Sequence, residues 1–176
     1  MRVVAGTARG RRLQVPPGRD TRPTSDRVRE AIFSALESMH AVGDAVAVDL
    51  FAGTGALGIE ALSRGARHVT FVDSSATSTS AIDANLAATG LAASATVRRA
   101  DVVRWLEAND TSGVDLAFAD PPYAFADWVT LANRLKADIL VAESDREPDL
   151  GAGWEVLRAK RYGTTVVVIA CPTPTP

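Results

Sequence analysis

Four short apolar runs, each with an aspartate at or near its end, most constrain the fold of this chain. The runs are AVAVDLF, HVTFVD, ATVRRAD and VDLAFAD, and their acids are Asp49, Asp73, Asp101 and Asp120. A helical pattern follows each run, and strands that alternate with helices indicate a mostly parallel sheet covered on both faces. Ligands of such sheets bind at the carboxyl ends of the strands. We therefore expect the four acids to line one site.

The two ends of the chain depart from this alternation. Two short β-prone runs, 2–5 and 11–15, flank a glycine-containing turn and predict a small N-terminal β-hairpin. Near the other end, WEVLRAKRYG and TTVVVIA are joined by a short turn, which predicts an antiparallel hairpin. The predicted fold class is therefore α/β: a Rossmann-like, seven-stranded, mostly parallel sheet with a C-terminal antiparallel hairpin and a small N-terminal β-hairpin extension. We divide the chain into an arm at 1–24, a main domain at 25–171 and a disordered tail at 172–176.

Charge is distributed unevenly along the chain. The whole sequence of 176 residues has a formal net charge of -2, yet its first 30 residues hold eight arginines and three acids. The N-terminal arm is therefore basic and the remainder acidic, which favours an anionic partner for the arm. The single cysteine, Cys171, excludes an internal disulfide and a cysteine-based metal cluster. No apolar stretch is long enough to span a bilayer, and we expect a cytoplasmic protein without a metal.

The stretch DLFAGTGALG predicts a cofactor loop. Gly53, Gly55 and Gly58 have the G-x-G-x-x-G spacing after a strand, and Asp73 follows about 20 residues on, as in the dinucleotide fingerprint. A dehydrogenase is therefore one alternative. However, Asp49 would bring a like charge close to a pyrophosphate, whereas S-adenosylmethionine has no phosphate and carries an ammonium and a sulfonium. We therefore expect S-adenosylmethionine as the cofactor.

Each acid at this edge has an expected partner on that cofactor. Asp49 would accept a hydrogen bond from the methionine end, Asp73 from both ribose hydroxyls, and Asp101 from the adenine amine. The expected cofactor-binding residues are Asp49, Ala52, Gly53, Thr54, Gly55, Asp73, Ser74, Asp101 and Val102.

The strand VDLAFAD is followed by two prolines and a tyrosine. Prolines lack an N–H donor, so Pro121 and Pro122 end the strand and leave acceptors at its edge. The carboxylate of Asp120 and the carbonyl of Pro121 suit a group with two N–H donors, such as the exocyclic amine of a nucleobase. Two acceptors that hold both hydrogens orient the nitrogen lone pair toward the methyl group. Tyr123 would stack on the base. The predicted catalytic residues are Asp120, Pro121 and Tyr123.

The combined motifs resemble a known family. DPPY after DLFAGTGALG is similar to the amino methyltransferases that act on adenine N6 or guanine N2. RVVAGTARGRRLQVPPG, TRPTSDRVREAIF and KRYGTTVVVI resemble the bacterial 16S rRNA guanine-N2 methyltransferases of RsmD type, from residue 2 to about residue 169. The resemblance implies a class I methyltransferase domain, S-adenosylmethionine as donor, and guanine N2 in 16S rRNA as acceptor, free or within a small-subunit assembly particle. It also implies that the arm binds RNA.

The arm supplies the expected RNA contacts, and two rival functions stay open. The predicted contacts are Arg9, Arg11, Arg12, Arg19, Arg22 and Thr24, the last two closing over the site. One rival is a DNA adenine-N6 methyltransferase, although such enzymes usually need an added region to read duplex sequence. The other is a catalytically silent RNA-binding module on the same scaffold. We expect a monomer.

Overall fold

The structure, a computed structural model, describes residues 1–15 and 25–174. Its helices are α1 (Asp26–Ser38), α2 (Ala56–Ser63), α3 (Ala76–Thr89), α4 (Val102–Ala108) and α5 (Trp128–Arg134), with a short 3-10 helix η1 at Ala92–Ser94. Its strands are β1 (Val46–Leu50), β2 (His68–Asp73), β3 (Ala95–Arg99), β4 (Val114–Ala119), β5 (Ala137–Ser144), β6 (Trp154–Tyr162) and β7 (Thr165–Pro172). Among the described residues, no helix is both long and apolar enough to cross a bilayer.

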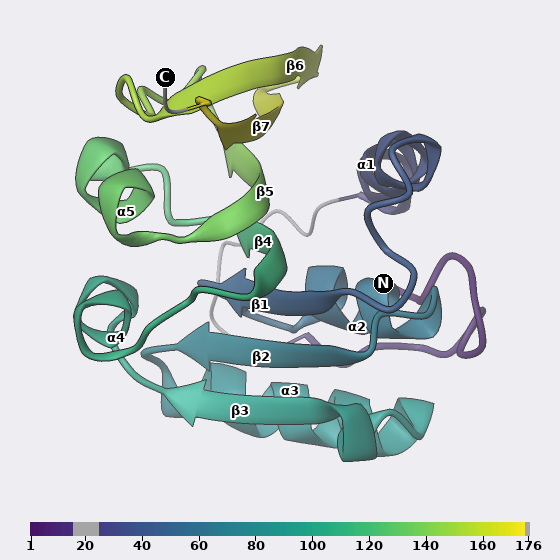
Figure 1. The fold of residues 1–176 in the computed structure, drawn as a ribbon. Helices are drawn as coiled ribbons and strands as arrows, with labels where there is room; N and C mark the ends of the chain where they lie inside the picture. Colours follow the sequence, from purple (N-terminus) through teal and green to yellow (C-terminus); the bar gives the residue numbers. More distant parts are fainter. Residues whose placement is uncertain (16–24, 175–176) are drawn as a thin grey trace.

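One sheet of seven strands organises the molecule, in the order β3-β2-β1-β4-β5-β7-β6 (Figure 1). The first five strands of this order pair in parallel, whereas β7 runs antiparallel to both β5 and β6. The predicted fold class is confirmed. Because chain order reverses beside β1, the carboxyl ends of β1 and β4 lie next to each other, which is where open α/β sheets bind ligands.

The two faces of the sheet are covered by different elements. One apolar cluster joins α1, α2 and α3 to the sheet and includes Val3, Ala8 and Leu13 of the arm. The second cluster joins α4 and α5 to the opposite face. Strand side chains alternate between the two clusters, so that Phe71 faces the first and Val72 the second. The first fifteen residues therefore belong to the core of the fold.

Ser25 caps the N-terminus of helix α1. The hydroxyl oxygen of Ser25 accepts a hydrogen bond from the Val28 N–H at 3.2 Å, and Val28, Ile32 and Leu36 are buried on one face. Met39, which the apolar pattern also places on that face, is instead 38 % exposed and lies just past the end of the helix. The helix therefore ends at Ser38, one residue before this apolar pattern ends.

Each end of the chain pairs less simply than its sequence pattern indicates. In the arm, Arg2 and Arg12 form an isolated antiparallel bridge, and the Val3 N–H donates to the Arg11 carbonyl at 2.9 Å. At the other end, β7 continues to Pro172, and the Thr173 N–H donates to the Gly153 carbonyl at 2.9 Å. Pro172 is therefore the last residue of β7, at the position where we expected the tail to begin.

Candidate methyl-transfer site

The turn between β1 and α2 has the backbone of a ligand-binding loop. Gly53 and Gly55 have φ of 56° and 75°, and Phe51, which is not a glycine, has φ of 58°. A left-handed conformation costs a non-glycine residue roughly 1–2 kcal/mol, so the surroundings must hold Phe51 in place. A Cβ on Gly58 would lie 2.3 Å from Phe71 Cε1, so the third glycine serves the packing of α2 on β2.

Asp49 lies at the base of this loop and is 1 % exposed. Its carboxylate accepts a hydrogen bond from the Gly58 N–H at 2.9 Å, in the first turn of α2. Burial raises the pKa of the Asp49 carboxyl to about 8, the Gly58 bond opposes this, and the charge of Asp73 adds to it. A cationic group bound here would relieve the repulsion between the two acids, whereas a phosphate would add to it.

Asp73, at the end of β2, fastens the loop from the neighbouring strand. One carboxylate oxygen accepts from the Gly53 N–H and the other from the Ser75 N–H, both at 2.9 Å. Asp73 is 1 % exposed, so its carboxylate holds the loop from inside the fold. Ser74, between these residues, is exposed, and its carbonyl accepts from Arg99 Nε at 3.4 Å.

The remaining predicted cofactor residues differ in exposure. Asp101 is exposed and caps α4, where its carboxylate accepts from the Arg104 N–H at 3.0 Å. Val102 is buried and packs with α5, and Ala52 is also buried. The Ala100 N–H donates to the Asp73 carbonyl at 3.1 Å, which brings the end of β3 beside β2. The predicted acids thus lie at or just past the carboxyl ends of neighbouring strands.

The segment after β4 lies beside the cofactor loop, because Ala119 pairs with Leu50 of β1. Asp120 is half-buried, Pro121 is buried, and the Tyr123 side chain is 46 % exposed. An exposed tyrosine next to two acceptors has a free face on which a base can stack.

Aromatic contacts join this segment to the cofactor loop. The ring centroids of Phe51 and Phe125 are 5.2 Å apart, and those of Phe125 and Trp128 are 5.5 Å apart, both edge-on. Such pairs add about 0.5–1.5 kcal/mol beyond the area they bury. Sequence reasoning did not single out Phe51 or Phe125, because phenylalanine in an apolar context usually indicates core.

Buried polar side chains of α2 hold the arm. Glu60, fully buried, accepts from the backbone N–H groups of Val4 and Ala5 at 2.8 and 2.9 Å. The Ser63 hydroxyl accepts from the Ala8 N–H at 2.9 Å. A Cβ on Gly6 would lie 1.8 Å from the Ser63 carbonyl oxygen, so only glycine permits this approach. A glutamate amid the apolar residues of ALGIEALS was the available signal for this contact.

Asn85 of α3 connects the arm to the cofactor loop. Its side-chain oxygen accepts from the Gln14 N–H at 2.7 Å, and its amide donates to the Gln14 carbonyl at 3.1 Å and the Thr54 carbonyl at 2.9 Å. Met1 Sδ also lies 3.7 Å from the Thr54 hydroxyl. Asn85 is fully buried and lies on the same helix face as Ile82. Its position on that apolar face was the only indication in the sequence that it is buried.

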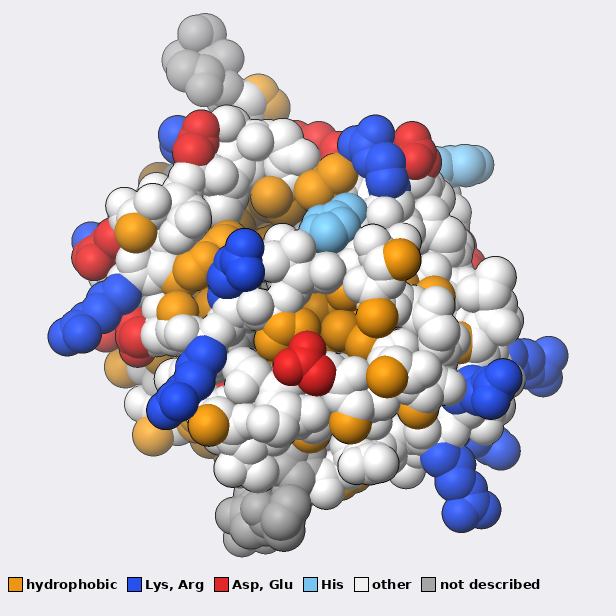
Figure 2. All heavy atoms as spheres, turned by 90° about the horizontal axis from the view of Figure 1, so that it is seen from below, with side chains coloured by type: hydrophobic (Ala, Val, Ile, Leu, Met, Phe, Trp, Pro, Cys, Tyr) orange, Lys and Arg blue, Asp and Glu red, His pale blue; other side chains and the backbone are white. Residues whose placement is uncertain are grey.

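Residues 1–15 of the arm therefore run along α2, with Met1 and Gln14 near the cofactor loop and the turn between them at the other end of the helix. The turn contacts Ser63, the last residue of α2, so Arg9 lies about one helix length, roughly 12 Å, from the loop. Arg9, Arg11 and Arg12 are exposed. Figure 2 shows Lys and Arg side chains gathered on the side where the arm lies in Figure 1. The predicted contacts Arg19, Arg22 and Thr24 lie outside the described residues.

Comparisons with known proteins match nearly the whole chain. A family model described as conserved hypothetical protein 95 matches residues 1–171. The chain is 38 % identical over 181 residues to the Bacillus subtilis (strain 168) protein named "Putative rRNA methyltransferase YlbH", covering 96 % of this chain and 97 % of that protein. It is 35 % identical over 173 residues to the Escherichia coli (strain K12) protein named "Ribosomal RNA small subunit methyltransferase D", covering 93 % and 85 %.

Solved structures share the fold. The one titled "Putative methyltransferase yhhF from Escherichia coli" has a TM-score of 0.85 and 34 % identity, over 99 % of both chains. A more distant one, titled as SMU.776, "a putative methyltransferase complexed with SAH", has a TM-score of 0.65 and 16 % identity, over 83 % of this chain and 48 % of that one. At that identity the likeness concerns the fold alone.

Proposed function

We propose that the chain methylates the exocyclic N2 of a guanine in 16S rRNA. The chain belongs to the family described as conserved hypothetical protein 95. The family resemblance that the sequence motifs indicated is confirmed by the match over residues 1–171 and by the 35 % identity to the E. coli enzyme. The chain is an S-adenosylmethionine-dependent rRNA methyltransferase, and guanine N2 as the acceptor atom is the finer part of the proposal.

The cofactor residues fit the proposed donor by charge and by backbone. Bound S-adenosylmethionine supplies an electrophilic methyl group on a sulfonium. Asp49 offers a buried carboxyl group to the cationic methionine end, and burial, with a smaller contribution from the charge of Asp73, raises its pKa. Asp73 accepts from the Gly53 N–H and would bind the ribose hydroxyls, and Asp101, just past the end of the next strand, would bind the adenine amine.

The observation that carries the proposal is the position of Asp120 and Pro121, one strand across from the cofactor loop. Their two oxygens would accept both hydrogens of the guanine amine and turn its lone pair toward the methyl group. Transfer of the methyl group to this nitrogen would break its bond to sulfur and leave S-adenosylhomocysteine, and the amine would lose one proton to water. Tyr123 would hold the base by stacking, since its ring is exposed beside these acceptors. The residues of the chain thus contribute orientation.

We further propose that the enzyme acts in the cytoplasm as a monomer, without a metal, on 16S rRNA that is free or within a small-subunit assembly particle. The exposed arginines of the arm, Arg9, Arg11 and Arg12, support an RNA substrate. Arg19, Arg22 and Thr24 stay predicted contacts. The division of the chain at residue 24 also stays a prediction. Because Val3, Ala8 and Leu13 are core residues, point substitutions test the arm better than its deletion.

Radiolabelled methyl transfer tests the function directly. The acceptors are 16S rRNA and small-subunit particles from cells that lack the protein, with duplex DNA in parallel, and the labelled nucleoside is then identified. We expect N2-methylguanosine in rRNA. N6-methyladenine in DNA with no label in rRNA would establish the adenine-N6 alternative. RNA binding without transfer to any acceptor would identify a silent binding module.

A further inference from the structure

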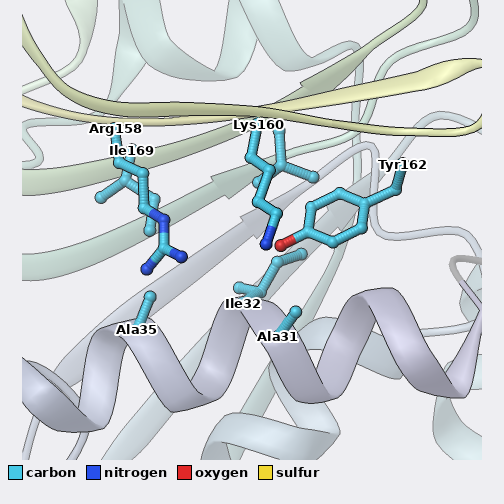
Figure 3. Close-up of a pocket in the computed structure, with 8 residues that line it drawn as sticks. Ala31, Ile32, Ala35, Arg158, Lys160, Tyr162 and Ile169 are labelled. Atoms are coloured by element: carbon cyan, nitrogen blue, oxygen red, sulfur yellow. The ribbon is translucent and has the colours of Figure 1, made fainter.

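A groove separates α1 from the edge strand β6, on the sheet face that also carries the arm. Ala31, Ile32 and Ala35 of α1 form one wall, and Arg158, Lys160 and Tyr162 of β6 form the other. These three side chains of β6 extend toward α1, as Figure 3 shows. The KRYG motif that contributed to the family resemblance therefore places two of its side chains in this groove, and the proposed chemistry assigns them no role.

The positive charge in the groove is uncompensated. Arg158 and Lys160 are exposed, and no carboxylate of residues 1–15 or 25–174 forms an ion pair with either. The acids of α1 are engaged elsewhere, because Glu30 and Glu37 pair with Arg64 at 2.7 and 3.0 Å. The groove therefore offers cations to an anionic ligand.

Tyr162 gives the groove an aromatic surface beside its cations. Lys160 Nζ lies 5.3 Å from the centroid of the Tyr162 ring, and the two side chains meet in the groove (Figure 3). A cation and an aromatic ring side by side are the combination with which proteins bind single-stranded nucleic acid, through a phosphate and a stacked base. An isolated anion would make no use of the ring.

One end of the groove lies toward the carboxyl ends of the parallel strands, where the candidate active site also lies. Ser144, at the carboxyl end of β5, pairs with Val166 of β7, and Thr165 pairs with Tyr162 of β6. The Tyr162 end of β6 therefore lies at the end of the sheet where the parallel strands finish, which is also where Asp120 follows β4. Three strand spacings, roughly 14 Å, separate β4 from β6 across the sheet. An RNA strand that places a guanine at Asp120 can reach the groove within a few nucleotides.

We propose that the groove between α1 and β6 is a second RNA-binding surface, in which Arg158 and Lys160 contact phosphates and Tyr162 contacts a base. This proposal rests on the proposed function, because it takes rRNA as the ligand. The arm contacts RNA from its place along α2, and the groove holds the substrate from α1 and β6. Two separate basic surfaces fix the orientation of an RNA better than one.

Equilibrium binding to a 16S rRNA transcript, measured from 50 to 300 mM KCl, tests the proposal. The test variant is Arg158→Gln with Lys160→Gln, and the matched control is Arg98→Gln, an exposed arginine on the opposite edge strand, β3. Each lost phosphate contact lowers the salt slope by about 0.7–0.9, so we expect the double variant to lose about 1.5 and to bind roughly tenfold more weakly at 100 mM. Tyr162→Ala should weaken binding with little change of slope. S-adenosylmethionine affinity, from calorimetry, should stay at the wild-type value in all variants.

Each result decides the proposal separately from the function. A double variant with wild-type affinity and slope would overturn it, as would an equal loss in Arg98→Gln. If the double variant bound small-subunit particles more weakly but bound the transcript normally, the groove would contact a ribosomal protein, and the proposal of an RNA-binding groove would be overturned. If the expected loss occurs while the wild-type protein transfers no methyl group to rRNA, the groove stands and the proposed function fails.

Discussion

The cofactor loop and the acceptor segment lie on adjacent strands, yet the fold treats them differently. The loop at 51–55 is fastened from two neighbouring elements, by Asp73 on Gly53 and by Asn85 on Thr54. The acceptor segment at 120–125 exposes Tyr123 and has a local bond from the Phe125 N–H to the Pro122 carbonyl at 2.8 Å. Bonds from two other elements thus hold the proposed cofactor loop, whereas the proposed acceptor segment exposes a large aromatic side chain.

The largest expected effect separates the two regions by their chemistry. Asp120→Ala should lower kcat by about 10²- to 10³-fold, the usual cost of one positioned polar group, while S-adenosylmethionine affinity changes less than about twofold. Single-turnover methyl transfer and calorimetry measure the two quantities. Asp127→Ala, an exposed carboxylate at the start of α5, is the control and should keep wild-type activity. Near-normal turnover of Asp120→Ala would contradict the proposal that the acceptor segment serves methyl transfer and the loop serves cofactor binding.

A second prediction concerns Asp49, whose pKa is raised from 3.8 to about 8. Without cofactor, the folded state binds the proton more tightly than the unfolded state, so stability should fall as pH rises from about 4 to 8. Asp49→Asn should flatten this fall in Tm and weaken S-adenosylmethionine binding by about 1–3 kcal/mol. Asp83→Asn, on the exposed surface of α3, should leave both unchanged. A wild-type Tm that rises over this pH range would contradict the account of the buried acid.

Asn85→Ala tests whether the neighbours of the cofactor loop hold it. The change removes bonds to Gln14 and Thr54 and leaves partly buried backbone groups without these partners, which should cost about 1–3 kcal/mol of unfolding free energy. We also expect weaker cofactor binding, because Thr54 loses its restraint. Urea denaturation and calorimetry measure these effects. The control is Asn133→Ala, at an exposed position of α5. Unchanged cofactor affinity in a destabilised Asn85→Ala protein would limit Asn85 to a structural role.

The smallest effect is expected from Phe125→Leu. This change keeps an apolar side chain but loses the edge-on contacts to Phe51 and Trp128, so about 1 kcal/mol of stability should be lost. Because Phe125 links the two loops, we also expect a drop in kcat of a few-fold. Val129→Ala, on an exposed position of α5, should have neither effect. A loss of stability without any change of kcat would show that the aromatic contacts do not position the acceptor segment.

Features with a local cause were predictable from the sequence. The run HVTFVD coincides with β2, because alternating apolar residues and a terminal aspartate mark both the strand and its end. The placement of Asp49, Asp73, Asp101 and Asp120 at one edge followed from strand order. The roles of these acids in binding and catalysis stay predictions, since they depend on ligands.

Features that depend on distant partners were not predictable. Glu60 binds backbone groups 55 and 56 residues away, and Asn85 binds Gln14 at a separation of 71. No short window of sequence contains both partners, and a glutamate on a helix usually indicates solvent. The same holds for Phe51, whose left-handed backbone is set by the loop around it.

The unpaired edges of the sheet have a consequence for the protein in concentrated solution. Both edge strands are cationic: β3 exposes Arg98 and Arg99, and β6 exposes Arg158, Lys160 and Arg161. A register shift between Val156 and Arg158 also distorts β6. Two molecules that approach edge to edge would bring like charges together along an irregular strand, so the sheet resists extension into a neighbouring copy. Colloidal stability is thus built into the strands that end the sheet.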